Sequence, residues 1–556
     1  MVLMPTIERG ACLITDLNSH LVSEPIGRIG CSSRPGEEKE VAQRNAFKTN
    51  SSFFRMLAMG AVGARAVQNY LNSLGHNIVE LERGSLTTRI WRDVKRKRVR
   101  IPDLCCTRCG VRIESRAKTN PDLSMSHSPS DVERAWHYGM IDSDWVAFPI
   151  LSAEEAVWSS GGLDLDRERS LWRERRFTTW HVEGRINLFT VASLKRVAPK
   201  QLKPKGVSEG SEVQVRWKAR FAPSSGKVVA VEDGPRLKAV NSVRLKYELD
   251  DEPNKSRYFQ LAADERPFLA PGETFEPHQV IAGQIEPLKT DASHCKGGCN
   301  IDKIAQMLAS RERTVRYTGC KLARLAKARR LVNKVRELAE DGEEDPYVRM
   351  EAKSYLCEVA GDSADDRFRA ILLDDADEQM RLEAAVTLAE TRTPASFDLL
   401  RTVLEDVTQP LFLRSACAWA VGCHGTREAA EVLVRAFADV APEIREEALV
   451  ALHHLGEVGF HPLLKGLEAS SAAIAAGAAE TLRRIQRAPA EEIAEMVERV
   501  NSTWPTWTLA HLPKDSVAPY IAALQSRRPD IHYAISVIWN FLDSWIADDW
   551  TPRATP

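Results

Sequence analysis

Hydrophobic and polar residues alternate with a different period in each part of the chain. Apolar residues recur with helical spacing over 53–74, whereas several short runs between 77 and 150 alternate residue by residue. Alternating runs separated by Gly, Pro, Asn and Asp then fill residues 177–290. Because helices repeat about every 3.6 residues and strands every two, these patterns predict an α/β domain followed by a β-rich domain.

The α/β part contains a definite order of expected elements. Ser51 and Ser52 are typical helix caps, and Gly75 is a typical helix stop. The expected elements are a helix over 53–74, strands over 77–82, 98–106 and 111–118, a helix over 131–137 and a strand over 144–150.

A longer repeat begins after residue 345. Its motif is apolar-Arg-x-x-Ala, with Cys in place of Ala in the third copy, and its arginines lie 32, 33 and 31 residues apart (Arg349, Arg381, Arg414 and Arg445). Internal periods of this length indicate a solenoid of stacked helix pairs. The pattern resembles the HEAT-repeat family over about 345–490. The resemblance implies an all-α array that binds a protein partner or a second copy of itself.

These patterns divide the chain into six parts. They are a flexible N-terminal segment (1–50), an α/β domain with a Cys-rich hairpin (51–176), a β-rich barrel or sandwich (177–290), a basic helical connector with cysteines (291–344), the repeats (345–490) and a helical C-terminal cap (491–556).

A row of charged residues lies around the Cys-rich turn. Side chains alternate along a strand, so Glu114, Arg116 and Lys118 point to the same face. Asp103 follows Pro102 in the preceding strand, and in a hairpin it approaches this row. Two carboxylates can bind Mg²⁺, and a neighbouring cation can stabilise charge that develops on a phosphate.

The Pro102-Asp103 and Glu114-Ser115-Arg116 pattern resembles the PD-(D/E)xK nuclease superfamily over roughly 53–150. The resemblance implies a restriction-endonuclease-like fold in which Asp103 and Glu114 bind Mg²⁺ or Mn²⁺. It places Arg116 or Lys118 beside the scissile phosphate. The family has Lys where this chain has Arg116, and Lys118 is one step further along the same face. The alternative is a basic β-hairpin with ordinary surface ion pairs.

A basic stretch leads into this constellation. It contains Trp91, and such a stripe with an aromatic residue favours contact with a phosphate backbone. Lys95–Arg98 can also be interpreted as a nuclear import signal, and a solvated charged strand is the plain alternative. The nucleic-acid-binding residues that we predict are Arg89, Arg92, Lys95, Arg96, Lys97, Arg98 and Arg100.

The cysteines predict a metal site. Cys106 and Cys109 have the spacing of half a zinc knuckle, and Cys105 and His127 are the candidates to complete it, with His76 and His137 as further ones. Cys295 and Cys299 form a weaker second motif, which either binds its own zinc ion or completes the first site in space. Free thiols are the alternative.

The β-rich part interleaves basic and aromatic residues, among them Trp217, Tyr247 and Tyr258. An oligonucleotide-binding barrel uses such residues for stacking and backbone contacts. The alternative, which we prefer, is a structural β-domain whose aromatic residues form its core.

Composition limits the classes of protein that fit. The 556 residues carry a formal net charge of −1, so any affinity for nucleic acid must come from local patches. We find no signal peptide and no run long enough to span a bilayer, which predicts a cytoplasmic protein. An odd number of cysteines, eleven, in such a chain favours metal binding over disulfides.

Two functions follow from these observations. The first is a metal-dependent nuclease carried on a HEAT scaffold, a combination that by analogy suits DNA repair, restriction or anti-phage defence. The second is a non-catalytic, zinc-containing adaptor that binds nucleic acid and recruits a partner. The first requires Asp103 and Glu114 to converge beside a cation, whereas the second predicts that they are apart or held in ion pairs.

Overall fold

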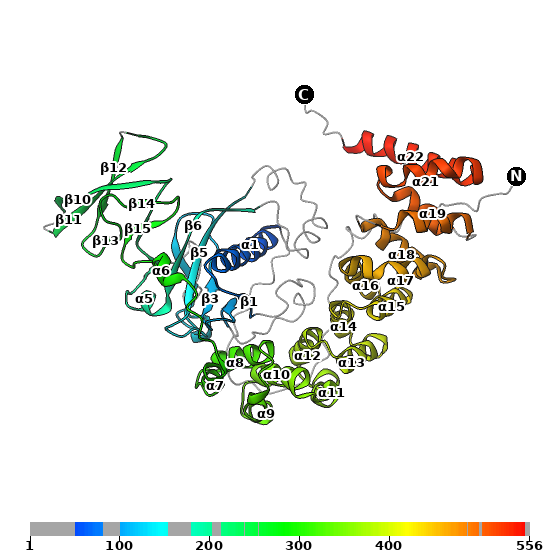
Figure 1. Ribbon diagram of the computed structural model, residues 1–556, viewed down its shortest axis with the longest axis horizontal. Helices are drawn as coiled ribbons and strands as arrows, with labels where there is room; N and C mark the ends of the chain where they lie inside the picture. Colours follow the sequence, from blue (N-terminus) through cyan, green and yellow to red (C-terminus); the bar gives the residue numbers. More distant parts are fainter. Residues whose placement is uncertain are drawn as a thin grey trace, which may run out of the picture. The chain divides into compact units, whose positions relative to one another are not determined.

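The computed structural model describes residues 51–81, 101–153, 180–202, 213–237, 240–253, 255–485, 488–499 and 503–550. Within these residues, a mixed sheet is followed by a β-rich region and then by paired helices (Figure 1). The predicted segment 1–50 and residues 154–179 lie outside the described residues.

The first described part is a five-stranded sheet with helix α1 (Ser51–Ser73) packed on one face (Figure 1). β1, β2 and β3 are antiparallel neighbours, β5 is parallel to β3, and β6 is antiparallel to β5. Gly63 lets α1 approach the sheet closely, because a Cβ there would lie 2.7 Å from the Cβ of Ala117. In sheet order the strands are β1 (Ile78–Glu80), β2 (Leu104–Cys106), β3 (Arg112–Ser115), β5 (Trp145–Ala153) and β6 (Trp180–Thr190).

The expected second helix of this part is absent. Only η1 (Val132–Arg134), a single 3₁₀ turn capped by the Asp131 side chain, occupies 131–137. Ala135 is already extended, with ψ 144°, and Trp136 then packs edge-on against Trp217, with ring centroids 5.2 Å apart. Burial of this indole against the β-rich region therefore prevails over the local helical pattern.

The β-rich region consists of three small sheets, and its aromatic residues are mostly core. Trp217 and Tyr247 are buried, whereas Tyr258 is exposed beneath the Arg244 guanidinium, 4.5 Å from the ring centroid. The strands, grouped by sheet, are β4 (Leu123–His127), β8 (Val213–Trp217) and β7 (Lys200–Leu202); β12 (Ser256–Leu261), β11 (Val240–Leu249), β10 (Gly226–Leu237) and β14 (Thr274–Phe275); and β13 (Arg266–Pro267), β15 (Val280–Gly283) and β9 (Ala219–Phe221).

Helices make up the rest of the described chain. Two short helices, α5 (Val191–Lys195) and α6 (Thr290–Ser293), lie at the ends of the β-rich part. The connector contains α7 (Ile301–Leu308), α8 (Arg313–Leu325) and α9 (Val332–Glu340). The array then runs α10 (Pro346–Tyr355), α11 (Ala364–Asp374), α12 (Glu378–Glu390), α13 (Pro394–Glu405), α14 (Leu411–Cys423), α15 (Arg427–Arg435), α16 (Pro442–Leu455), α17 (Phe460–Leu467), α18 (Ala472–Arg484), α19 (Ala490–Arg499), α20 (Thr503–His511), α21 (Lys514–Arg527) and α22 (Pro529–Trp550).

Two of the repeated arginines link successive repeats. Arg381 donates to the Gln409 side chain at 2.8 Å, and Arg414 donates to Asp439 and, at 3.0 Å, to the Leu404 carbonyl. These two motifs therefore tie one helix pair to the loop that begins the next.

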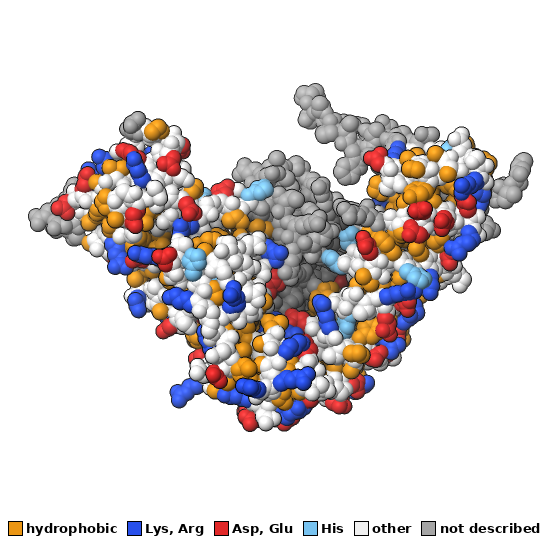
Figure 2. Space-filling view, viewed as in Figure 1, with side chains coloured by type: hydrophobic (Ala, Val, Ile, Leu, Met, Phe, Trp, Pro, Cys, Tyr) orange, Lys and Arg blue, Asp and Glu red, His pale blue; other side chains and the backbone are white. Residues whose placement is uncertain are grey.

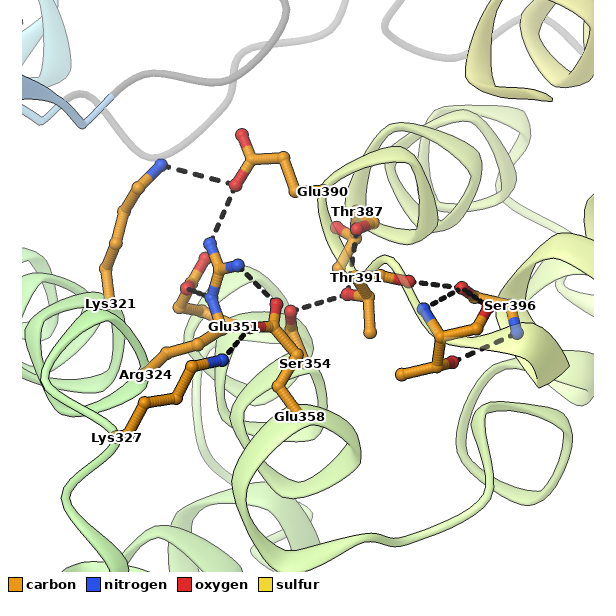
Figure 3. A network of polar contacts seen from close by, with 11 residues as sticks. Lys321, Arg324, Lys327, Glu351, Ser354, Glu358, Thr387, Glu390, Thr391 and Ser396 are labelled. Atoms are coloured by element: carbon orange, nitrogen blue, oxygen red, sulfur yellow. Dashed lines mark hydrogen bonds and ion pairs between the residues drawn. The ribbon is translucent and has the colours of Figure 1, made fainter. Parts of the chain in front are cut away.

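A buried polar network joins the connector to the first repeats (Figure 3). The Arg324 guanidinium, 5% exposed, contacts Glu351 at 2.9 Å, Glu358 at 2.6 Å and Glu390 at 2.7 Å. Lys321 of the same helix lies 3.5 Å from Glu390 and donates to the Leu81 carbonyl at 3.2 Å. Helix α8 thus contacts both the array and the chain that leaves β1.

The surface of the array carries mixed charge. On the face that Figure 2 shows, basic and acidic side chains are interspersed over the repeats with no large patch of one sign. Among the described helices, none has the length and apolar character that a membrane span needs.

Candidate metal centre and charged face of the β2–β3 hairpin

The β2–β3 hairpin presents different side chains on its two faces. Leu104, Cys106 and Ile113 belong to the core beneath α1. Cys105 belongs instead to the core formed with α7 and α8, and residues alternate along a strand. Asp103, Arg112 and Glu114 therefore share the face of Cys105. Gly110, with φ of +76°, closes the turn and donates to the Cys106 carbonyl at 2.8 Å.

Four soft donors gather at the hairpin turn. The ligand atoms of His76, Cys106, Cys109 and Cys295 all lie within 4.8 Å of one another. The Cys109 sulfur is 3.6 Å from His76 Nδ1, and the sulfurs of Cys106 and Cys295 are 3.9 Å apart. A tetrahedral zinc site has sulfur–sulfur edges of about 3.8 Å and sulfur–nitrogen edges of about 3.5 Å, given its usual bond lengths. The cluster can therefore hold a metal ion such as zinc.

Backbone groups orient these donors. His76 Nε2 donates to the Ser293 carbonyl at 2.8 Å, which leaves Nδ1 unprotonated on the side of the thiols. The backbone amides of Asn77 and Arg108 donate to the Cys106 sulfur at 3.5 and 3.4 Å. A hydrogen bond from the Cys109 thiol lowers the pKa of Cys106. The surroundings thus favour a thiolate at Cys106, the form that binds metals.

The four donors come from three distant segments. His76 follows Gly75, whose φ of +84° ends α1, while Cys106 and Cys109 lie at the end of β2 and in the turn. Cys295 comes from the connector, whose backbone donates to the Leu74 carbonyl at 3.1 Å. A second backbone bond of 2.9 Å, from Cys299 to the Arg108 carbonyl, holds the connector on the turn.

The predicted zinc ligands are partly brought together. Cys106 and Cys109 are in the cluster, and of the second motif Cys295 lies with them. Cys105 and Cys299 are not in it, because both pack against the core of α7 and α8. His127 is not in it either, since it lies in β4, paired with Val213 of β8. His76 was only a secondary candidate, although the CxxC motif 30 residues later was the signal for such a partner.

The charged residues lie on the other face of the hairpin. Leu104 pairs with Ile113 and Cys105 with Arg112, and the same register carried one residue further aligns Asp103, just before β2, with Glu114. Asp103 accepts from the backbone amide of Ser115 at 2.8 Å. Glu114, 6% exposed, forms an ion pair with Arg116 at 2.5 Å.

Lys118 continues this row at the end of the hairpin. Its backbone forms a parallel β-bridge with Ile150 of β5, and its ammonium donates to the Ser124 hydroxyl at 3.2 Å. Burial lowers the pKa of Lys118. The cation nearest to Glu114 is therefore Arg116, and Lys118 is held by a different neighbour.

A buried ion pair borders the charged face. Arg112 contacts Asp144 at 2.5 Å, and the two side chains are 1% and 2% exposed. Arg112 also donates to Thr314 of α8 at 3.1 Å, so it joins the hairpin to the connector. Burial raises the pKa of Asp144, and the attraction of Arg112 opposes that rise. Asp144 thus follows the turn at 142–143 and also pairs with the hairpin.

The predicted nucleic-acid-binding residues lie outside the part of the chain that the structure describes. They all lie in 82–100 (Arg89, Arg92, Lys95, Arg96, Lys97, Arg98 and Arg100).

Comparison with known proteins identifies part of the array. Residues 366–453 match a family model described as HEAT repeats. HEAT repeats are thus present within the predicted range 345–490. The matched residues do not include the five-stranded sheet. No curated protein matches the chain.

Several solved structures are similar to the chain at low identity. Human deoxyhypusine hydroxylase in complex with glycerol is 16% identical over 40% of this chain and 99% of that chain, with a TM-score of 0.18. The complex of CpcE and CpcF of phycocyanin lyase from Nostoc sp. PCC7120 is 16% identical over 43% and 94%, with a TM-score of 0.21. A designed armadillo repeat protein in complex with the peptide (KR)4 is 17% identical over 43% and 98%, with a TM-score of 0.18.

Proposed function

We propose that the protein is a divalent-metal-dependent nuclease whose site is the charged face of the β2–β3 hairpin. The observation that carries this proposal is the strand register, which sets Asp103 opposite Glu114 on one face. The order of elements supports it as well. A helix, three antiparallel strands and a strand parallel to the third follow the layout of the PD-(D/E)xK superfamily, except for the missing second helix.

The donors on this face fit a hard cation. Directly opposed residues of an antiparallel pair have Cβ atoms about 4.5–5.5 Å apart, so the Asp103 and Glu114 carboxylates can reach one ion. Mg²⁺ and Mn²⁺ prefer carboxylate oxygens and water. When bound, such an ion offsets charge on the phosphate and lowers the pKa of a coordinated water.

The neighbouring cations suit the phosphate. Arg116 holds Glu114 in place through their ion pair, and its buried Nε has no hydrogen-bond partner among the described residues. A guanidinium in this position can donate to a phosphate oxygen while it keeps its carboxylate partner. Lys118, desolvated at the end of the row, supplies a second positive charge to the developing phosphorane oxygens.

The adaptor alternative predicts carboxylates that are taken up in ion pairs, and the Glu114–Arg116 contact is of that kind. An activity measurement therefore has to decide between them. The experiment compares cleavage of mixed DNA and RNA with Mg²⁺ or Mn²⁺ by the intact protein, Asp103→Asn and Glu114→Gln. Asp142→Asn is the matched control, because that carboxylate is exposed and pairs with Lys195.

We expect metal-dependent cleavage in the intact protein and the control, and its loss in both site variants. Cleavage that survives both substitutions would reject this site. No cleavage by any of the four proteins, with nucleic-acid binding retained, would leave the non-catalytic adaptor as the function.

A second function, protein binding by the array, is favoured by the HEAT-repeat match at 366–453. Stacked helix pairs present an extended surface suited to a protein partner or a second copy of the chain. Crosslinking of the purified full chain, with mass determination, distinguishes self-association from a monomer that awaits a partner.

A further inference from the structure

We propose that His76, Cys106, Cys109 and Cys295 form a structural Zn²⁺ site that fastens residues 294–300 of the connector to the turn of the β2–β3 hairpin. This role goes beyond the nuclease proposal and does not depend on it. Zinc would join distant parts of the chain, since Cys106 and Cys295 are 189 residues apart in the sequence.

The donor set is the first argument for zinc. Three sulfurs and one imidazole nitrogen match a Cys₃His site, and four protein donors leave no position for a substrate, which is typical of structural sites. A disulfide does not explain the arrangement, because the sulfurs of Cys106 and Cys295 are 3.9 Å apart and a disulfide bond measures about 2.05 Å.

The orientation of the donors is the second argument. The carbonyl of Ser293 accepts the Nε2 proton of His76 and directs the lone pair of Nδ1 at the sulfurs. Two backbone amides point at the Cys106 sulfur. Such partners orient and stabilise the ligands of metal sites, and metal affinity usually falls about 10–100-fold when they are removed.

The connector itself is the third argument. Residues 294–300 contain no helix or strand, and Gly297 and Gly298 have φ of +66° and +89°. His294, Lys296, Gly298 and Asn300 are exposed, so the segment buries little apolar surface of its own. One backbone hydrogen bond to the hairpin turn, one to Leu74 after α1, and the cluster hold this segment in place. Binding of a metal ion would be the strongest of these interactions.

The zinc site has a consequence for the opposite face of the hairpin. α7 begins at Ile301, directly after residues 294–300, and its Lys303 donates to the Cys109 carbonyl. α7 and α8 then pack against Cys105 on the other face. The chain thus passes around the hairpin turn, and zinc would hold it at the start of that passage.

The first experiment measures zinc in the purified full chain by inductively coupled plasma mass spectrometry. We expect one zinc per chain, and less than about a tenth of that in Cys109→Ser and Cys295→Ser, since structural sites need all four ligands. Cys299→Ser is the matched control, because Cys299 lies near Gly110 but outside the cluster, and this variant should keep its zinc. Loss of zinc from Cys299→Ser but not from Cys295→Ser would overturn the ligand set.

A second measurement covers the case in which the variants do not fold. The intact protein is alkylated with and without a zinc chelator, and the modified cysteines are identified by mass spectrometry. We expect Cys106, Cys109 and Cys295 to react only after chelation, whereas half-buried Cys299 reacts in both samples. A folded protein without zinc whose three cluster thiols react without chelator would overturn the proposal. Neither readout uses a nucleic-acid substrate, so failure of the nuclease proposal would leave both unchanged.

Discussion

The two faces of the β2–β3 hairpin make an informative comparison. One face and the turn hold soft donors, and two of the four come from outside the hairpin, from the end of α1 and from the connector. The other face holds carboxylates and cations that belong to the hairpin or lie beside it. The soft cluster thus assembles through long-range folding, whereas the charged row follows from the pairing of two neighbouring strands.

The two sets also differ in what surrounds their atoms. In the cluster, backbone groups orient His76 and Cys106 while the four ligand atoms face one another. In the charged row, Glu114 already forms an ion pair with Arg116, and Asp103 already accepts a hydrogen bond from the Ser115 amide. An ion at the cluster would therefore complete an arrangement, whereas an ion at the row has to compete with existing contacts. The proposed structural role of the cluster and the proposed catalytic role of the row can therefore be tested separately.

Removal of metal from the cluster should change the stability of the protein more than any of the substitutions that follow. Chelation should destabilise the full chain by several kcal/mol, because binding energy at a structural zinc site is folding energy. Thermal unfolding with and without chelator measures it. Asp103→Asn, with an intact cluster, should show the same decrease on chelation. Equal stability in both conditions would mean that the cluster does not hold the fold together.

Breaking the buried ion pair beside the charged row should rank next. Asp144→Leu leaves the Arg112 guanidinium buried without its carboxylate, which we expect to cost about 3–5 kcal/mol of unfolding free energy. Urea unfolding measures this loss. The double variant Arg112→Leu/Asp144→Leu should recover part of it, since no lone charge remains buried. A double variant less stable than Asp144→Leu would show that contacts of Arg112 with Thr314 and Gly139 matter more than its charge.

Glu114→Gln should separate chemistry from stability. It keeps the shape of the side chain and removes the negative charge, so cleavage should fall by about 100-fold or more while the zinc content is unchanged. Initial rates at saturating Mg²⁺ and zinc analysis of the same sample provide the two readouts. A parallel loss of zinc and cleavage would mean that the two faces are not independent.

Lys118→Met should have the smallest effect on stability, with a size that depends on pH. Burial lowers the pKa of Lys118 below its usual 10.5, so the folded protein favours the neutral amine more than the unfolded chain does. The ammonium therefore costs stability at pH 7, and the cost disappears as pH rises from the folded pKa towards 10.5. We expect Lys118→Met to be more stable than the intact protein at about pH 7 and this gain to shrink at about pH 10. Urea unfolding at both values checks it, and a gain that grows with pH would contradict the assignment.

The repeats were the easiest part to predict because their signal is local. Each apolar-Arg-x-x-Ala motif lies within one helix, and neighbouring helix pairs make most of their contacts with the next pair along the chain. The same reasoning found the strands that contain Cys106 and Glu114. It failed for 131–137, where burial of Trp136 against a strand some 80 residues later ends the helix after one turn.

The cluster shows where this reasoning stops. The CxxC spacing identified Cys106 and Cys109 as ligands, but nothing near them in sequence distinguishes His76 from His127, or Cys295 from Cys299. The course of the backbone in the folded protein decides which histidine and which cysteine reach the turn. His76 stands where α1 ends over the turn, and Cys299 is drawn to the core on the other face.

The amino-acid sequence by itself therefore determined the periodic elements: the repeats and the strands of the hairpin. These depend on backbone geometry over a few residues, and the spacing of apolar and polar residues indicates that geometry directly. Only the tertiary structure decided which histidine and which distant cysteine meet the CxxC turn, and which ion pairs enclose the charged row. Those pairings join distant segments, since His76 contacts Ser293 217 residues away and Arg112 contacts Thr314 202 residues away, and they depend on how whole elements pack.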